Sequence, residues 1–349
     1  MSIKALNIFT KPEPITVLQA NPREVLKPVE SAILRVKTLP DVMDCAINDF
    51  LQAGEINPVA KIRFHRILDA ALPSIMRPEN YLNKGRDSKV FKISDNYVAK
   101  IRRGKTEDNA IRVFNLARTP DKRFNQLGIY YGEPVIRVGN VEILKNATPN
   151  EYTPCGAIWF DNNSTIEQMR HKYKNEYLPS CSSVPQDGYD ELAQGLTQLN
   201  GISDKGMFGK RTFYTPDIQN PNNVLIADNH FRIVDDLDKT QISNPNNIFT
   251  MLQPLMLRLT PDTSVEMDFN KDVLHNRKNI LRKTMIAAEK ANLPLEQNEL
   301  IDPHAEFYLD NVTGNNNYTS MISLVGDMRA KGFSLKDRIG FINNALLEK

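Results

Sequence analysis

The sequence is 349 residues long, which is enough for one large domain or two modest ones. Hydrophobic residues make up 41% of it and charged residues 25%, the balance of an ordinary soluble globular protein. With 44 basic and 42 acidic residues the net charge is +2, which gives no argument for a nucleic-acid or membrane partner. The sequence has no apolar run long enough to cross a bilayer, and its first residues lack the apolar core of a secretory signal peptide.

The cysteines and histidines indicate neither the disulfide framework of an extracellular protein nor a zinc site. Cys45, Cys155 and Cys181 are far apart and odd in number, which is typical of structural thiols in a reducing compartment. The five histidines share no metal-ligand spacing, so a zinc site is not expected.

The N-terminal part changes character near residue 36. Residues 1–35 carry several prolines and weak periodicity, which predicts a flexible leader. Residues 36–78 place apolar residues at helical spacing, which predicts a helical extension of two or three helices with a core-facing stripe. These apolar positions are Val42, Ala46, Ile47, Phe50 and Leu51, followed by Val59, Ile62, Ile67, Leu68 and Leu72.

Short apolar runs separated by turn residues dominate residues 79–147. Their strand propensity and spacing predict hairpins that form an antiparallel sheet of about five strands. Between the second and third runs, residues 105–118 predict a helix that ends at a Thr-Pro pair. The runs lie at residues 90–93, 97–101, 128–131, 135–138 and 141–144.

A second hairpin is predicted where residues 224–226 and 231–234 flank a polar turn. Asp217 and Asn223 precede its first strand, and Asp235 follows its second. The hairpin would bring these side chains together, and hard oxygen ligands in one place suit Mg²⁺ beside a phosphate. Helical patterns on both sides predict a mainly helical C-terminal part. They cover residues 189–199, 250–259, 271–291, 318–330 and 335–347.

The order and spacing of these features resemble the protein-kinase fold over about residues 80–260. In this resemblance Asp217 is the catalytic Asp, and Asn223 and Asp235 are the metal-binding residues. The spacing from Asp217 to Asn223 is one residue longer than in kinases, so Asn222 competes with Asn223 for this role. The implied fold is α+β and bilobal, with an antiparallel β N-lobe at 79–147 and a mainly helical C-lobe at 148–349. The helical extension of residues 36–78 precedes the N-lobe.

The kinase strand lysine is matched by Lys100, within Val98-Ala99-Lys100-Ile101, which resembles the V-A-I-K motif. The resemblance implies that Lys100 holds the α- and β-phosphates of ATP. Glu107, in the predicted helix, is the candidate partner of this lysine. Asp108 competes for that role, and the alternative is that both acids complement the dipole of the helix.

The glycine-rich loop that covers the phosphates in kinases is matched only in part. Its G-x-G-x-x-G-x-V pattern corresponds here to Asn83, Gly85, Ser88 and Val90, so the middle glycine alone is present. Small residues in such a loop let backbone N–H groups approach phosphate oxygens. The four residues are therefore candidate nucleotide-binding positions.

The departures from the kinase pattern indicate a divergent enzyme. Thr215 and Pro216 replace the histidine and arginine of H-R-D, and Asp236 and Leu237 replace the phenylalanine and glycine of D-F-G. The missing arginine and A-P-E motif imply activity without activation-loop phosphorylation. This compact form resembles the bacterial type III secreted effector kinases of the OspG and NleH type.

That second resemblance implies a secretion signal in the leader and action in the host cytoplasm, with the bacterial cytoplasm as the alternative. It also implies a host protein as substrate, a host activator protein as a candidate partner and a role in virulence. The function expected is that of a Ser/Thr protein kinase using ATP and Mg²⁺. A pseudokinase binding module, an adenylylating or small-molecule transferase, and a merely solvated acidic turn remain the alternatives.

Overall fold

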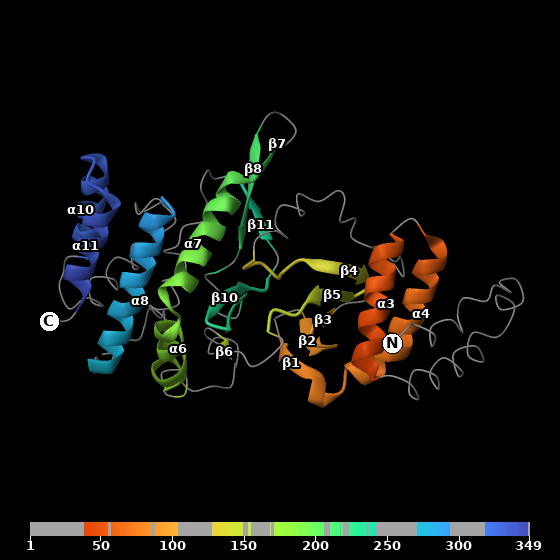
Figure 1. The fold of residues 1–349 in the computed structure, drawn as a ribbon. Helices are drawn as coiled ribbons and strands as arrows, with labels where there is room; N and C mark the ends of the chain where they lie inside the picture. Colours follow the sequence, from red (N-terminus) through yellow and green to blue (C-terminus); the bar gives the residue numbers. More distant parts are fainter. Residues whose placement is uncertain are drawn as a thin grey trace, which may run out of the picture. The chain divides into compact units, whose positions relative to one another are not determined.

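The computed structural model divides the chain into two compact units (Figure 1). The first comprises Met1–Ala117 with Pro134–Pro149, and the second Arg118–Glu133 with Asn150–Lys349. Among the described residues, the first unit has one antiparallel sheet with two long helices, and the second combines helices with two small sheets, so the predicted α+β class is confirmed. The structure describes residues 38–54, 57–84, 88–103, 128–148, 153–154, 168, 171–205, 210–216, 218, 223–235, 237–241, 271–293 and 318–347.

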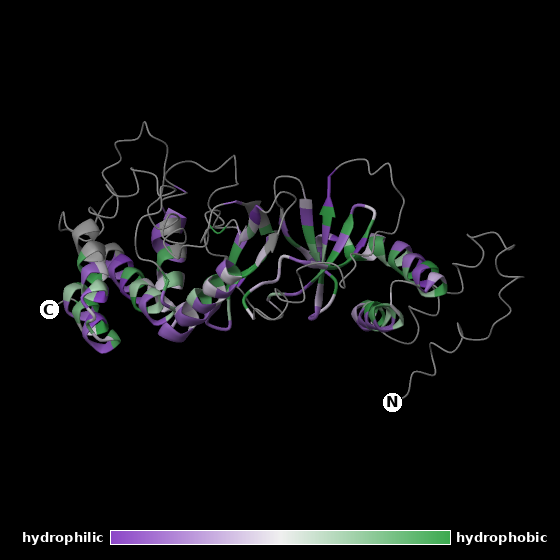
Figure 2. Ribbon diagram, turned by 90° about the horizontal axis from the view of Figure 1, so that it is seen from above, coloured by the Kyte–Doolittle hydropathy of each residue, from purple (hydrophilic) through white to green (hydrophobic). Residues whose placement is uncertain are grey.

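Two helices, α3 (Leu39–Ala53) and α4 (Pro58–Ile75), begin the described part of the first unit. Each has a proline in its first turn, and the side chains of Thr38 and Asn57 cap α3 and α4 by accepting backbone N–H groups. Both helices contain apolar and polar residues, green and purple in Figure 2, and their buried residues recur every three or four positions. This amphipathic pattern is the one that the sequence predicted for residues 36–78.

The sheet of the first unit has five strands in the order β1-β2-β3-β5-β4, all antiparallel. The prediction of five strands was right in number and wrong in one member. Residues 128–131 do not join this sheet, and residues 81–84 form its edge strand instead. The 3₁₀ turn η2 (Pro78–Asn80) leads into β1 (Tyr81–Lys84), β2 (Ser88–Lys92), β3 (Tyr97–Arg102), β4 (Pro134–Val138) and β5 (Val141–Lys145).

One face of this sheet and the two helices share a single hydrophobic core. Because strand side chains alternate between faces, apolar residues of β2 to β5 meet the apolar stripes of α3 and α4. Phe50 and Phe64 stack between the helices with ring centroids 4.9 Å apart. Burying such side chains contributes about 1.5–3 kcal/mol each. The sheet residues of this core that are at most 4% exposed are Phe91, Ala99, Ile136, Val141 and Ile143.

Polar contacts also fix α3 to the turn between β2 and β3. Asp44 accepts hydrogen bonds from Ser94 Oγ at 2.5 Å and from Asn96 Nδ2 at 2.6 Å. The Tyr97 hydroxyl donates to Asn48 Oδ1 at 3.0 Å. The helices therefore form part of the same folded unit as the sheet.

The second unit surrounds a core formed by its helices and the strands β9 and β10. Its small sheets have the orders β10-β9-β6 and β11-β8-β7, and no helix in the described part of the chain is long and apolar enough to span a membrane. The strands are β6 (Thr153–Pro154), β7 (Ser203–Lys205), β8 (Arg211–Pro216), β9 (Val224–Ala227), β10 (His230–Ile233) and β11 (Leu237–Thr240). The helices are the π-helix η5 (Tyr173–Tyr177), α6 (Leu178–Ser183), α7 (Gln186–Gly201), α8 (Lys271–Lys290), α10 (Tyr318–Ala330) and α11 (Leu335–Leu346).

A buried carboxylate links the last three helices. Glu289, at the end of α8, is fully buried and accepts from Arg329 Nη2 of α10 and Arg338 Nε of α11, each at 2.6 Å. Lys283, also on α8, donates to two carbonyl oxygens at the end of α6, those of Ser182 and Val184. These charged contacts fix the helices around the second core.

Candidate functional site

The strands β9 and β10 form the hairpin that the sequence predicted. Ala227 pairs with His230, and the two residues between them, Asp228 and Asn229, have φ values of 51° and 65°. Positive φ at both central residues is the signature of a type I′ turn, whose twist matches that of the strands. Asp and Asn tolerate this conformation better than other side chains do, which is why the chain turns here.

The open end of this hairpin brings Asn223 and Asp235 together. The Val234 N–H donates to the Asn223 carbonyl oxygen at 2.9 Å, which extends the pairing of the strands by one step. The Asn223 Nδ2 then donates to Asp235 Oδ2 at 2.8 Å. Asn223 is only 9% exposed, so this charge-assisted hydrogen bond is partly shielded from water.

This pair fits the oxygen donors that Mg²⁺ requires. The carboxylate of Asp235 and the Oδ1 of Asn223 are hard ligands, and Mg²⁺ is often bound by one or two carboxylates with phosphates and water. In the described part of the chain, no group of three or more His, Cys, Asp or Glu residues could hold a metal. The remaining ligands would therefore have to come from the nucleotide, from water or from residues outside the described ranges.

Three predicted site residues, Gly85, Glu107 and Asp217, lie outside the described residues. The structure describes the strand that precedes Asp217: β8 ends at Pro216, which pairs with Leu237 at the start of β11. The catalytic role of Asp217 and the nucleotide-binding roles of Gly85 and Glu107 stay predictions.

Residues 128–131, which the sequence predicted in the five-stranded sheet, contact the strand that leads to Asp235. Tyr130 forms a parallel bridge with Ile233, the Tyr131 N–H donates to the Ile233 oxygen, and the Ile233 N–H donates to the Ile129 oxygen, both at 2.7 Å. Gly132 follows, so close to Asp235 that a Cβ at this position would lie 1.8 Å from the Asp235 carbonyl oxygen. Sequence reasoning missed this glycine, because the contact joins segments about 100 residues apart.

Helix α7 supports the hairpin near its turn. His230 Nδ1 lies 2.6 Å from Glu191 Oε2, and Tyr189 meets Phe231 edge-on with ring centroids 4.9 Å apart. Gly188 lets the helix approach the turn closely, because a Cβ there would lie 2.6 Å from the Asn229 carbonyl oxygen. The hairpin is thus positioned at both ends by packed neighbours.

In the first unit, one row of residues crosses all five strands. Asn83 pairs with Val90, Val90 with Lys100, Lys100 with Glu142, and Glu142 with Arg137. Directly opposed residues in antiparallel strands project from the same face of the sheet. Three predicted nucleotide-binding residues, Asn83, Val90 and the half-buried Lys100, therefore share one face, opposite the face that packs on α3 and α4.

The same face carries an ion cluster that sequence reasoning missed. The Glu142 side chain is 1% exposed, and its Oε1 pairs with Arg102 Nε at 3.0 Å and with the Arg137 guanidinium. Ser88, another predicted nucleotide-binding residue, is 7% exposed and pairs with Arg102 across β2 and β3. The cluster makes this face of the sheet predominantly cationic around Lys100.

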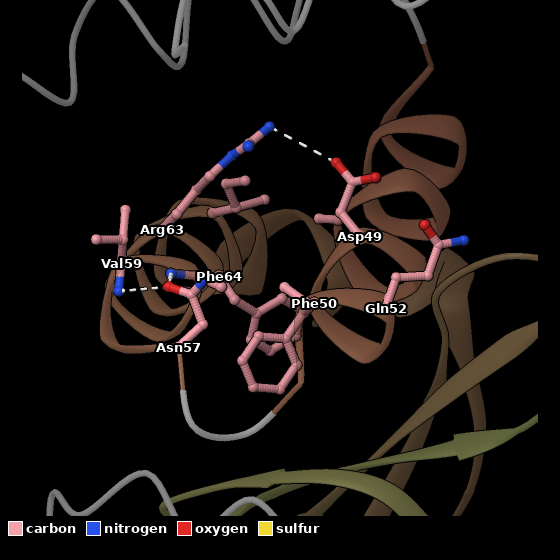
Figure 3. Close-up of a pocket in the computed structure, with 11 residues that line it drawn as sticks. Asp49, Phe50, Gln52, Asn57, Val59, Arg63 and Phe64 are labelled. Atoms are coloured by element: carbon pink, nitrogen blue, oxygen red, sulfur yellow. Dashed lines mark hydrogen bonds and ion pairs between the residues drawn. The ribbon is translucent and has the colours of Figure 1, made fainter. Parts of the chain in front are cut away.

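A cavity of about 460 Å³ lies between α3 and α4. Figure 3 shows Phe50 and Phe64 at its floor, and the Arg63–Asp49 ion pair, at 3.6 Å, at its rim. None of the predicted site residues lines it. Two of its charged lining residues, Asp49 and Arg63, are paired with each other.

No family model matches the sequence, and comparison with curated proteins finds no match. Two similar solved structures are both phosphotransferases. The gentamicin complex of the aminoglycoside phosphotransferase APH(2")-IIa is 15% identical, with a TM-score of 0.30 over 84% of this chain and 97% of that chain. Choline kinase LicA from Streptococcus pneumoniae is 9% identical, with a TM-score of 0.26 over 72% of this chain and 98% of that chain. Because the identities and TM-scores are this low, the functional assignment depends on this chain's own residues.

Proposed function

We propose that the chain is an ATP-dependent phosphotransferase, with Asn223 and Asp235 as its Mg²⁺-binding residues. The observation that carries the proposal is the 2.8 Å hydrogen bond between these two side chains at the open end of the hairpin. It holds two oxygen-bearing groups together before any ligand arrives. Such preorganisation is what phosphoryl transfer requires, because positioning and charge neutralisation supply most of the catalysis.

The roles of the other residues follow from the chemistry of a triphosphate. A metal ion at Asn223 and Asp235 would neutralise the charge of the phosphates. Lys100, on a central strand of a rigid sheet, is proposed to bind phosphate oxygens as a point charge. Asp217 is proposed to accept the proton of the acceptor hydroxyl, and Asn83 to Val90 to border the phosphates.

The acceptor and the cellular setting are finer proposals, supported by the sequence resemblance alone. We propose a Ser or Thr hydroxyl of a host protein as the acceptor, and delivery into the host cytoplasm by a type III system. A small-molecule hydroxyl is the competing acceptor, since the chemistry proposed for Asp217 and the metal residues is the same for both.

Incubation with γ-labelled ATP, Mg²⁺ and host-cell lysate tests the proposal. We expect label to appear in a protein band, and Asp217→Asn to lower kcat by about 10²-fold with ATP affinity nearly unchanged. Asp228→Asn, at the exposed hairpin turn, is the matched control and should transfer label at the wild-type rate.

Two results would contradict either the proposed acceptor or the proposed enzymatic activity. Label found only in a small-molecule fraction would overturn the protein acceptor. Nucleotide binding without label transfer to any species would overturn the enzymatic proposal in favour of a binding module.

A further inference from the structure

The end of β10 lies between two neighbouring segments. On one side Ile233 pairs with Val224 of β9, and on the other it exchanges backbone hydrogen bonds with Ile129 and Tyr131. The next residue of the second segment, Gly132, passes directly over the backbone of Asp235. Asp235 is therefore hydrogen-bonded to Asn223 through its side chain, and Gly132 lies close against its backbone.

Gly132 is needed here for space and not for backbone conformation. Its φ lies outside the left-handed region, so a residue with a side chain could adopt its conformation without strain. A Cβ, however, would lie 1.8 Å from the carbonyl oxygen of Asp235, 2.4 Å from its carbon and 3.0 Å from its nitrogen. All three atoms are backbone, so no side-chain rotation relieves the overlap, and either Gly132 or Asp235 must move.

We propose that Gly132 is a positioning residue for Asp235. Because Gly132 has no Cβ, residues 129–132 can lie against the Asp235 backbone, and this contact keeps the Asp235 carboxylate against Asn223. This inference rests on the proposed function, because it assigns Gly132 to the metal pair of that site. Gly132 touches neither metal nor substrate in this account. It acts through Asp235, as the groups behind metal ligands generally do.

Gly132→Ala is the direct test, and Gly188→Ala is its matched control. A Cβ at Gly188 would also meet backbone, the Asn229 oxygen at 2.6 Å, but near the turn of the same hairpin. Mn²⁺ binding in the presence of ADP, measured by electron paramagnetic resonance, reports on the metal pair without requiring turnover. We expect Gly132→Ala to weaken Mn²⁺ binding by about 10-fold or more, the scale of residues that support metal ligands. Gly188→Ala should lower the unfolding midpoint and leave Mn²⁺ affinity within about twofold.

A second measurement needs neither metal nor nucleotide. The Asn223 side-chain amide donates to Asp235, so its NMR signals and hydrogen exchange report directly on the pair. We expect faster exchange of this amide in Gly132→Ala and no change in Gly188→Ala. Ile129→Ala loosens the same segment without any overlap at Asp235, and it should accelerate the exchange even if Gly132→Ala does not fold.

The outcomes separate this inference from the proposed function. Wild-type affinity for Mn²⁺ and unchanged Asn223 exchange in Gly132→Ala would overturn the role of Gly132 alone. Equal losses in Gly132→Ala and Gly188→Ala would also overturn it, since they would show general destabilisation. If the wild type bound no Mn²⁺ with ADP, the proposed function would fail, and the Asn223 exchange would still decide the role of Gly132.

Discussion

The side-chain amide of Asn223 joins two residues twelve positions apart into one polar pair. A hydrogen bond to a charged group contributes about 1.5–3 kcal/mol, which is enough to hold one rotamer of each side chain. Because the Nδ2 atom of Asn223 is the donor, its Oδ1 is the atom suited to a cation. In this orientation the pair leaves an amide oxygen for a cation, in addition to the hydrogen bond that contributes to folding.

Tyr97 provides a test of stability at the residue scale. Burial, and then the nearby Asp44 carboxylate, raise the pKa of the Tyr97 hydroxyl above its ordinary value of 10.0. The unfolded chain therefore releases this proton at lower pH than the folded chain does. The stability linked to it is fully present below about pH 10 and is lost as the pH rises through the folded-state pKa.

Tyr97→Phe should therefore flatten the decline of stability at alkaline pH. At pH 7 the variant should be less stable by about 1 kcal/mol, because the hydrogen bond to Asn48 is lost. Urea unfolding midpoints of the two proteins, measured from pH 7 to pH 11, give both effects. A constant difference between the proteins across this range would contradict the account of Tyr97.

The sequence alone predicted that Asn223 and Asp235 lie together, but no sequence pattern indicated the contact of Gly132 with Asp235. Counting outward from the turn at Asp228 and Asn229 places the two metal candidates at the end of the hairpin, which is a local inference. The contact of Gly132 depends on a bridge between segments about 100 residues apart, which no local pattern specifies. Asp217, the predicted catalytic residue, lies outside the described residues, and its role stays a prediction.

At the scale of elements, the same difference between local patterns and long-range contacts explains why residues 128–131 were predicted in the wrong sheet. Residues 128–131 have the composition of a strand, and Tyr130 does bridge a strand. Its partner is β10 of the second unit and not the sheet of the first. Strand propensity reports that a segment fits a pleated surface, but the choice of neighbour is set by packing.

The cross-strand cluster of β3, β4 and β5 gives a prediction for an element. Glu142→Gln keeps the shape of the side chain and removes the charge that Arg102 and Arg137 share. We expect a loss of about 1–3 kcal/mol in the free energy of unfolding. This loss in the free energy of unfolding is smaller than the loss expected for a fully buried ion pair. The reason is that the Arg102 side chain is 43% exposed and can turn to water.

Denaturant unfolding of Glu142→Gln beside Asp95→Asn measures this effect. Asp95 forms an ion pair with Lys92 at 2.7 Å, but its side chain is 76% exposed, so its loss should be barely detectable. Equal effects of the two substitutions would show that the Glu142 cluster does not stabilise the sheet.

At the scale of the whole molecule, each unit carries part of the proposed chemistry on elements that pack against a hydrophobic core. In the first, Lys100 lies on the third strand of a five-stranded sheet whose other face is covered by α3 and α4. In the second, Asn223 and Asp235 lie at the end of a hairpin packed on α7. The α+β class followed from the sequence because it depends on periodicity, whereas the ion cluster around Glu142 depends on strand register.

Calorimetric titration with ATP is the measurement that tests the proposed binding of MgATP by Lys100, Asn223 and Asp235. We expect the wild type to bind ATP and the removal of Mg²⁺ to weaken the binding. Lys100→Ala and Asp235→Ala should each weaken it by about 10-fold or more, the loss expected when a contact to a charged group is removed. Lys92→Ala, on the same sheet, is the control and should bind as the wild type does. Unchanged ATP affinity in both Lys100→Ala and Asp235→Ala, with folding intact, would contradict the account.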